Sequence, residues 1–270
     1  MTVSNVDAAG LSHERAGPNP RIVSLVPSIT ELLFDLGLAD SVVGRTGFCI
    51  HPKEEVKSVP KVGGTKDVKI EQLLSLKPTH VIVNIDENTR DTYEELSKTV
   101  ENVIVTHPIL PTDNLDLYKL IGWIFNREKE ADRFCMCLEQ RLEILTRSNS
   151  KHEPQTVIYL IWREPWMTIS TSTYIGKMLE LVNWRLIETH SNKRYPEIDE
   201  HLLCSEDADL ILLSSEPYPF KEKHRKEIAN LRGSEHGIHI VDGEMFSWYG
   251  SRALKALNYI ERFSSKLVLN

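Results

Sequence analysis

Short apolar runs alternate along the first half of the chain with segments in which apolar residues recur every three to four positions. The runs predict strands and the periodic segments predict helices. The predicted strands are residues 22–26, 42–45, 81–85 and 103–106, and the predicted helices are residues 28–36, 70–76 and 89–99. Ser28 and Glu31 have the spacing of a capping box, and Gly37 is typical of a helix end. Strands and helices that alternate in this way indicate a parallel sheet covered by helices.

The same alternation begins again in the second half of the chain. The predicted strands are residues 156–162, 210–214 and 238–241, and the predicted helices are residues 174–182, 198–204, 221–230 and 251–265. We therefore expect an α/β fold of two Rossmann-like lobes, each built on a parallel sheet.

The stretch between the two halves has helical spacing and no strand signal. Its second part, residues 128–148, would extend about 30 Å as a helix, so we predict one long backbone α-helix that joins the lobes. The alternative is a helix of one lobe followed by a plain loop, because Ser148, Asn149 and Ser150 are typical of loops. The predicted domains are a disordered N-terminal tail (1–20), an N-terminal α/β lobe (21–112), a helical linker (113–150) and a C-terminal α/β lobe (151–270).

The composition is that of an acidic globular chain. Its 270 residues include 32 Lys and Arg against 39 Asp and Glu, a formal net charge of −7. We therefore expect no nucleic-acid partner, because a nucleic-acid groove needs clustered cations. The longest apolar stretch, residues 22–39, is interrupted by Pro27, Glu31 and Asp35, so we expect no membrane insertion. The first twenty residues lack the apolar core of a signal peptide, which predicts a cytoplasmic protein, or a periplasmic one if the N-terminus is incomplete.

The motifs of common α/β enzymes are missing from the sequence. No glycine-rich dinucleotide loop follows the first predicted strand, and neither a phosphate loop nor a Gly-x-Ser-x-Gly motif occurs, so we expect no nucleotide cofactor. The ten histidines are scattered apart from His236 and His239, which we interpret as part of a solvated loop. His51 and His107, each beside a proline after a predicted strand, are better candidate ligands by position.

Large aromatic residues follow several of the predicted strands. In open parallel sheets, the loops beyond the carboxyl ends of the strands line the ligand-binding crevice. Rings gathered there favour a flat or bulky apolar ligand over a bare ion. These residues are Phe48 in the first lobe and Trp162, Trp166, Tyr195, Phe246, Trp248 and Tyr249 in the second. The alternative is that each ring only fills the local core.

Two ordered series of residues carry a resemblance to a known family. The first series is Ser24, Pro27, Thr30, Glu31, Val43, Gly44, Cys49, Pro52, Pro60, Val62, Gly63, Gly64, Glu71, Leu76, Lys77 and Pro78. The second series is Ile161, Trp162, Pro165, Tyr195, Pro196, Glu200, Asp207, Asp209, Leu210, Asp242, Gly243, Gly250, Ser251 and Arg252. Together they resemble the helical-backbone metal receptors, the class III solute-binding proteins of ABC transporters, and above all their cobalamin-binding branch. The resemblance implies the class III periplasmic-binding-protein fold, with the ligand in a cleft between the lobes.

The resemblance also implies ligand-binding roles for individual residues. Phe48 matches a tyrosine, Trp166 a phenylalanine and Tyr195 a tryptophan among the rings that sandwich the corrinoid. Glu244 matches an aspartate that meets the polar periphery of the ligand. Trp248 stands where the family has an arginine.

Two carboxylates are implied to bind a partner protein. Glu71 and Glu200, each at the start of a predicted helix, match the acidic residues that dock on arginines of an ABC importer permease. The alternative role of both residues is to stabilise the positive end of their helix dipoles.

We therefore predict a non-catalytic, monomeric binding protein that holds a cobalamin-type corrinoid. The stacking rings are Phe48, Trp162, Trp166, Tyr195 and Trp248. The cobalt arrives inside the macrocycle, so the protein need not bind the metal directly, although a neutral His51 is a candidate axial ligand. The alternative ligands are haem or a ferric siderophore. A further alternative is an enzyme that uses Glu87 and His51 for proton transfer.

Overall fold

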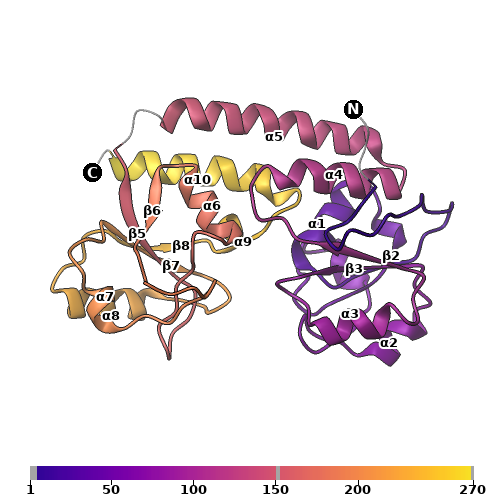
Figure 1. Cartoon of the computed structure of the whole chain (residues 1–270), viewed down its shortest axis with the longest axis horizontal. Helices are drawn as coiled ribbons and strands as arrows, with labels where there is room; N and C mark the ends of the chain where they lie inside the picture. The colour runs from indigo at the N-terminus through magenta and orange to yellow at the C-terminus, as the bar shows by residue number, and fades with distance from the viewer. Residues whose placement is uncertain (1–4, 150–152, 269–270) are drawn as a thin grey trace. The chain divides into compact units, whose positions relative to one another are not determined.

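The computed structural model describes residues 5–149 and 153–268. By its internal contacts the chain divides into unit 1, which comprises residues 1–108, 112–139 and 248–253, and unit 2, which comprises residues 109–111, 140–247 and 254–270. Each unit contains one four-stranded parallel sheet (Figure 1). The predicted α/β fold of two lobes with parallel sheets is therefore confirmed. The parts of the predicted domains at residues 1–4, 150–152 and 269–270 lie outside the described residues.

Unit 1 is built on a sheet with the strand order β2-β1-β3-β4. Its strands are β1 (Ile22–Ser24), β2 (Val42–Arg45), β3 (His80–Asn84) and β4 (Asn102–Thr106). Its helices are α1 (Pro27–Asp35), η1 (Ala39–Ser41), η2 (Glu55–Ser58), α2 (Ile70–Ser75), α3 (Arg90–Leu96) and α4 (Asp113–Ile124). In Figure 1, α2 and α3 lie on one side of this sheet and α1 and α4 on the other. The two central strands are buried along their whole length, as expected for a parallel sheet covered on both faces.

Unit 2 repeats this plan with the strand order β6-β5-β7-β8. Its strands are β5 (Gln155–Leu160), β6 (Trp184–Leu186), β7 (Leu210–Ser214) and β8 (Ile238–Val241). Its helices are α6 (Tyr174–Glu180), α7 (Glu200–Leu203), α8 (Glu222–Arg232) and α9 (Glu244–Ser247). Two short elements, β6 and α9, were not predicted, since they are only three and four residues long.

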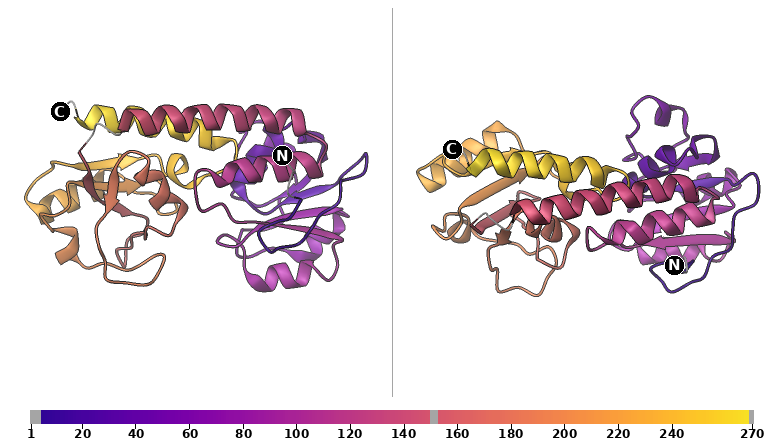
Figure 2. Two further views of the ribbon diagram at one scale, coloured as in Figure 1. Left: turned by 45° about the horizontal axis from the view of Figure 1, so that its top comes forward. Right: turned by 90° about the horizontal axis from the view of Figure 1, so that it is seen from above.

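Two long helices contribute residues to both units. They are α5 (Glu128–Asn149), predicted as the backbone helix, and α10 (Arg252–Val268). Within unit 2 the two helices lie side by side (Figure 2), and Arg141 Nη2 on α5 donates a 2.7 Å hydrogen bond to Glu261 Oε2 on α10. Residues 128–149 form one uninterrupted helix, so the alternative with a loop from Ser148 is wrong as far as residue 149.

The start of α1 differs from the predicted capping box. Pro27 occupies the first helical turn, where a missing N–H costs nothing, and the cap residue is Val26. Ser28 is a buried residue inside the helix and so does not occupy the cap position, while Glu31 forms an ion pair with Arg252. The helix end was predicted correctly, because Gly37 adopts a φ of +76° that favours glycine.

The N-terminal segment also differs from the expected disordered tail. Asp7 and Ala8 bind the edge strand β4, where Ala8 N–H donates to the Val105 carbonyl oxygen and the Asp7 carboxylate accepts from Val105 N–H. Asp7 accepts further hydrogen bonds from the backbone of Ala9 and Leu11 and lies 3.0 Å from Nε2 of His13. The segment thereby satisfies backbone groups that an open sheet edge would expose. A single carboxylate with four donors orders a stretch whose composition resembles a loop.

His80, at the start of β3, is an uncharged histidine in the interior of unit 1. It is 5% exposed, its Nδ1 lies 2.8 Å from the Thr79 hydroxyl, and its ring packs edge-on against Phe125. Burial, together with the nearby His13, lowers the pKa of His80 from 6.5 to about 4. The unfolded chain binds a proton here near pH 6.5 and the folded chain does not, so acid favours unfolding between these two values.

We expect His80→Gln to reduce the dependence of stability on pH between about pH 6.5 and 4. With a pKa displaced to this extent, protonation of His80 in the unfolded chain lowers the free energy of unfolding by about 2 kcal/mol at pH 5. Urea unfolding at a series of pH values measures it as the slope of the unfolding free energy, whatever the absolute stability of the variant. His190→Gln is the matched control, because the His190 side chain is 83% exposed. An unchanged slope in His80→Gln would contradict a neutral His80.

Candidate functional site

Exposed apolar side chains follow β2 and β3 at the carboxyl edge of the unit 1 sheet, where β1 lies between these two strands. Phe48 and Ile50, after β2, are 61% and 47% exposed, and Ile85, directly after β3, is 51% exposed. We call these three residues the unit 1 surface. Monomeric proteins rarely leave contiguous large apolar groups in water unless they bind something there.

Residues 64–66 contact both loops that carry this surface. The Phe48 ring lies beside Gly64, where an added Cβ would be in van der Waals contact with Phe48 Cε2 at 3.4 Å. The next residues bind the loop after β3, because Lys66 Nζ donates to the Asp86 carbonyl and Asn88 Nδ2 donates to the Thr65 carbonyl. The two loops therefore form one supported surface.

Trp248 belongs to unit 1, although the sequence analysis assigned it to the C-terminal lobe. Its ring is 8% exposed and packs edge-on against His51, with 5.4 Å between the ring centroids. The Arg252 guanidinium lies 4.8 Å from the indole centroid, and Glu31 holds it through two hydrogen bonds of 2.7 and 3.0 Å. Arg252 and Glu31 are both buried, so a desolvated ion pair packs against the Trp248 ring and fixes its position. Trp248, which the sequence predicted as an exposed stacking ring, is therefore a buried residue that supports the surrounding loops.

Glu87 and Tyr249 form a second polar contact of unit 1. The Tyr249 hydroxyl donates a 2.8 Å hydrogen bond to Glu87 Oε1. Burial, and then the charge of Glu87, raise the pKa of Tyr249 well above its ordinary value, so the phenol remains a donor. Glu87 thus has a partner that the sequence analysis did not consider, and its proposed proton exchange with His51 stays a prediction.

Unit 2 presents two exposed rings on adjacent loops. Trp162 follows β5 and is 41% exposed, and Tyr195 precedes α7 and is 38% exposed. Hydrogen bonds from Thr168 N–H to Pro196 O and from Ile198 N–H to Trp166 O join the two loops. We call Trp162 and Tyr195 the unit 2 surface. Both residues were predicted from their positions in the sequence.

Trp166 and Glu244 lie deeper than the exposed rings of unit 2. Trp166 is 9% exposed and its ring stacks parallel to Phe220 with 6.2 Å between centroids, while the Arg163 guanidinium lies 5.3 Å from the indole. Trp166 thus belongs to the hydrophobic core of unit 2, which is the alternative that the sequence left open for each ring. Glu244 is half-buried and is the first residue of α9.

Glu71 and Glu200 are exposed residues in the first turns of α2 and α7. Asp199 caps α7 by accepting a 2.8 Å hydrogen bond from Leu202 N–H. Because this neighbour already supplies a carboxylate to the helix start, Glu200 is not needed for capping. Its side chain is exposed to solvent, as a docking residue requires.

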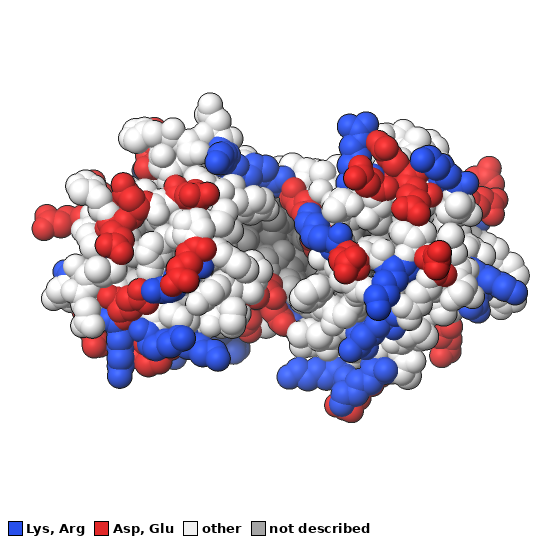
Figure 3. Space-filling model, turned by 90° about the horizontal axis from the view of Figure 1, so that it is seen from below, with Lys and Arg blue, Asp and Glu red and all other residues white. Residues whose placement is uncertain are grey.

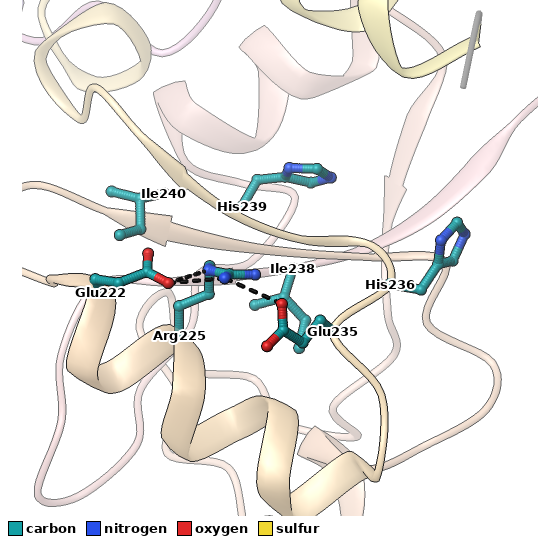
Figure 4. Close-up of a pocket in the computed structure, with 7 residues that line it drawn as sticks. All are labelled: Glu222, Arg225, Glu235, His236, Ile238, His239 and Ile240. Carbon is teal, nitrogen blue, oxygen red and sulfur yellow. Dashed lines mark hydrogen bonds and ion pairs between the residues drawn. The ribbon is translucent and has the colours of Figure 1, made fainter.

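A separate depression of about 520 Å³ lies at the edge strand β8 (Figure 4). Figure 4 shows Glu222 and Glu235 pointing at Arg225, and their ion pairs measure 2.7 and 3.2 Å. The rings of His236 and His239 point elsewhere, so the two histidines do not form a joint ligand set. The charges of this depression are already paired with one another.

A cavity of about 680 Å³ in unit 1 lies under the N-terminal segment, at the amino ends of β3 and β4. Its lining includes Glu14, Arg15, His80 and Glu101. Neither this cavity nor the depression at β8 lies at the carboxyl ends of the strands, where α/β sheets bind ligands.

Metal-ligating groups do not gather within residues 5–149 and 153–268, where no cluster of three or more His, Cys, Asp or Glu side chains could hold an ion. His107, one of the candidate ligands, instead lies 3.4 Å from the Asp86 carboxylate. In the same part of the chain, none of the helices has the length and hydropathy that a membrane crossing requires. On the face shown in Figure 3, basic and acidic side chains are interspersed on both units.

Comparisons with known proteins agree with this architecture. Residues 22–233 match a family model described as periplasmic binding protein. The ABC transporter substrate-binding lipoprotein YvrC of Bacillus subtilis, which is named as uncharacterized, is 31% identical over 174 residues, or 60% of this chain and 54% of the relative. The chain thus spans about half the length of that relative. The vitamin B12-binding protein of Photorhabdus laumondii is 22% identical over 208 residues, or 76% of this chain and 74% of the relative.

Solved structures share the fold at low sequence identity. The periplasmic vitamin B12 binding protein BtuF of Vibrio cholerae has a TM-score of 0.80 and 16% identity, and the match covers 94% of this chain and 99% of that one. The periplasmic haem-binding protein RhuT from Roseiflexus sp. RS-1 has a TM-score of 0.75 and 19% identity, with coverage of 92% and 99%. The predicted class III fold is therefore confirmed. Since proteins named for different ligands share it, the fold alone does not select the ligand.

We expect Glu31→Gln to destabilise the folded chain by about 3 kcal/mol or more, because it removes the Glu31 charge from the buried ion pair with Arg252. Chemical denaturation followed by circular dichroism measures the change. The control is Glu94→Gln, which removes an exposed partner of Arg90 on α3 and should cost less than about 1 kcal/mol. An equal loss of unfolding free energy in the two variants would contradict a stabilising role of the buried Glu31–Arg252 pair.

Proposed function

Because this chain belongs to the periplasmic binding protein family, as its sequence predicted, we propose that it binds a cobalamin-type corrinoid and delivers it to an ABC-type permease. Members of this family are solute-binding proteins, and several relatives are named vitamin B12-binding proteins. The corrinoid ligand and its delivery to a permease are what we propose for this chain.

One observation carries the choice of ligand: each unit exposes large apolar side chains, including at least one ring, at the loops where an α/β sheet binds its ligand. Phe48 is the ring of the unit 1 surface, and Trp162 and Tyr195 make up the unit 2 surface. Burying one such ring yields about 1.5–3 kcal/mol. A planar macrocycle offers each ring an extended apolar face, which neither a bare metal ion nor a small polar solute provides.

The proposed contacts differ in kind. Phe48, Trp162 and Tyr195 stack on the macrocycle, and Glu244 accepts hydrogen bonds from amides at its periphery. The buried rings Trp248 and Trp166 act chiefly as supports beneath these contacts. The cobalt is cargo carried within the corrin ring, and the imidazole of His51, beside Trp248, is the candidate for its axial position.

Delivery to a permease requires a partner surface outside the ligand site. We propose that Glu71 and Glu200, exposed in the first turns of α2 and α7, pair with arginines of that permease. This role needs an extracytoplasmic location. The cytoplasmic location expected from the sequence has no support among the relatives, which are named for periplasmic binding or as a lipoprotein.

Titration with a ligand panel tests the proposal. We expect cyanocobalamin and dicyanocobinamide to bind with a Kd of about 1 µM or lower by calorimetry and to quench tryptophan emission. Haemin and ferrichrome, which represent the haem and ferric-siderophore alternatives, should bind at least about tenfold more weakly. Tight binding of haemin or ferrichrome without binding of either corrinoid would contradict the proposed ligand. A changed corrinoid spectrum after the protein has been removed would favour the enzyme hypothesis.

Variants in each unit separate specific stacking from adventitious adsorption. Phe48→Ala and Trp162→Ala should each weaken corrinoid binding by about tenfold, because each removes one buried ring contact. Leu231→Ala is the control, since Leu231 on α8 is as exposed as Trp162 but lies outside both surfaces. If only one of the two variants, Phe48→Ala or Trp162→Ala, loses corrinoid affinity, the surface of the other unit does not contact the ligand.

A further inference from the structure

We propose that Tyr218 is a positioning residue, which fixes the orientation of the Trp162 ring for contact with the ligand. The inference rests on the proposed function, in which Trp162 stacks on the macrocycle. Tyr218 lies in the segment that follows β7, and neither the sequence motifs nor the resemblance identified it.

Tyr218 contacts the exposed tryptophan directly. The two ring centroids are 5.6 Å apart and the ring planes meet at 69°. The backbones are also joined, because Tyr218 N–H donates a 3.3 Å hydrogen bond to the carbonyl oxygen of Ile161, the residue before Trp162. An edge-on contact fixes the tilt of an indole and leaves at least one of its faces uncovered by the tyrosine. That face remains available to a planar ligand.

Tyr218 is itself held by buried groups. Its ring packs against Phe220, with 4.7 Å between centroids, and its hydroxyl oxygen lies 3.3 Å from Nε2 of His224. Phe220 is 4% exposed and His224 is 4% exposed, so both belong to the interior of unit 2. The half-buried Tyr218 thus links a rigid core to a ring at the surface.

The hydrogen-bond pattern fixes the tautomer of His224. The backbone N–H of Lys221, the cap residue of α8, donates to Nδ1 of His224 at 2.9 Å, so this nitrogen carries a lone pair. In the neutral ring the proton is then on Nε2, which donates to the Tyr218 oxygen. Burial, followed by the charges of Lys223 and Arg163, lowers the pKa of His224 and favours this neutral form. The start of α8 therefore determines where the Tyr218 hydroxyl lies.

A double-mutant cycle on the full chain tests the proposal. We expect Tyr218→Leu to weaken cyanocobalamin binding by about three- to tenfold. Without the tyrosine ring, Trp162 is mobile in the free protein, and its immobilisation on binding costs conformational entropy. Tyr218→Phe keeps the ring and should retain affinity within about twofold. In the Trp162→Ala background, Tyr218→Leu should cause no further loss, because its effect acts through the indole. Additive losses would overturn the proposal.

A ligand-free measurement separates this inference from the proposed function. The emission anisotropy of Trp162, obtained by subtracting the signal of the matching Trp162→Phe protein, should fall in Tyr218→Leu and persist in Tyr218→Phe. The control is Tyr93→Leu, which removes a half-buried tyrosine from the core of unit 1. If the wild-type chain fails to bind cyanocobalamin, the proposed function fails while the anisotropy still reports on Tyr218. Unchanged anisotropy in a folded Tyr218→Leu would overturn the positioning role.

Discussion

Parallel strand pairing is the constraint on which both units depend. Each sheet is wholly parallel, so each strand must be followed by a connection that returns over the sheet, and most of these connections contain helices. The carboxyl ends of all strands in a unit then lie at one edge, and the loops that leave them become neighbours. Trp162 and Tyr218 in unit 2, which follow the paired strands β5 and β7, are brought into contact in this way. The same pairing buries both faces of the central strands, which supplies the rigid support that the exposed rings need.

The support beneath each surface uses a different chemistry. In unit 1 the buried Glu31–Arg252 pair lies under Trp248, and a desolvated ion pair is rigid because both charges depend on their mutual contact. In unit 2 an aromatic cluster of Tyr218, Phe220 and Trp166 takes that place, and the neutral His224 completes it. Both arrangements hold a large ring in place before any ligand arrives. Pre-organisation of this kind reduces the entropy lost on binding.

The sequence predicted the elements whose signals are local. The bounds of β2, β7 and β8 match those predicted, because each is a short segment rich in β-branched or other apolar residues. The capping box failed because Glu31 gains more from a partner more than two hundred residues away than from its own helix start. The N-terminal segment was missed for a similar reason, since the donors that order Asp7 include an amide of β4. The strand β6 was not predicted because its three residues, Trp-Arg-Leu, lack the continuous apolar pattern that made the equally short β1 recognisable.

Some residues of the candidate site could likewise be identified from local sequence signals, and others depend on contacts with distant residues. Phe48, Trp162 and Tyr195 could be identified from position, because a loop after a strand or before a helix can be located in the sequence. The burial of Trp166 could not, since it depends on the parallel ring of Phe220, more than fifty residues later. Trp248 was assigned to the wrong unit because the chain crosses between units after α9, which no local pattern marks. Tyr218 was overlooked although it follows a correctly predicted strand, so the rule that identified Trp162 would also have identified it.

A crystal structure of the chain with cyanocobalamin bound tests the central claim most directly. The account predicts electron density for the corrin ring in van der Waals contact with Phe48 of unit 1 and with Trp162 of unit 2, and a Tyr218 ring that still packs edge-on against Trp162. Density at the β8 depression beside Arg225, or in the cavity under the N-terminal segment, with Phe48 and Trp162 left in solvent, would contradict it.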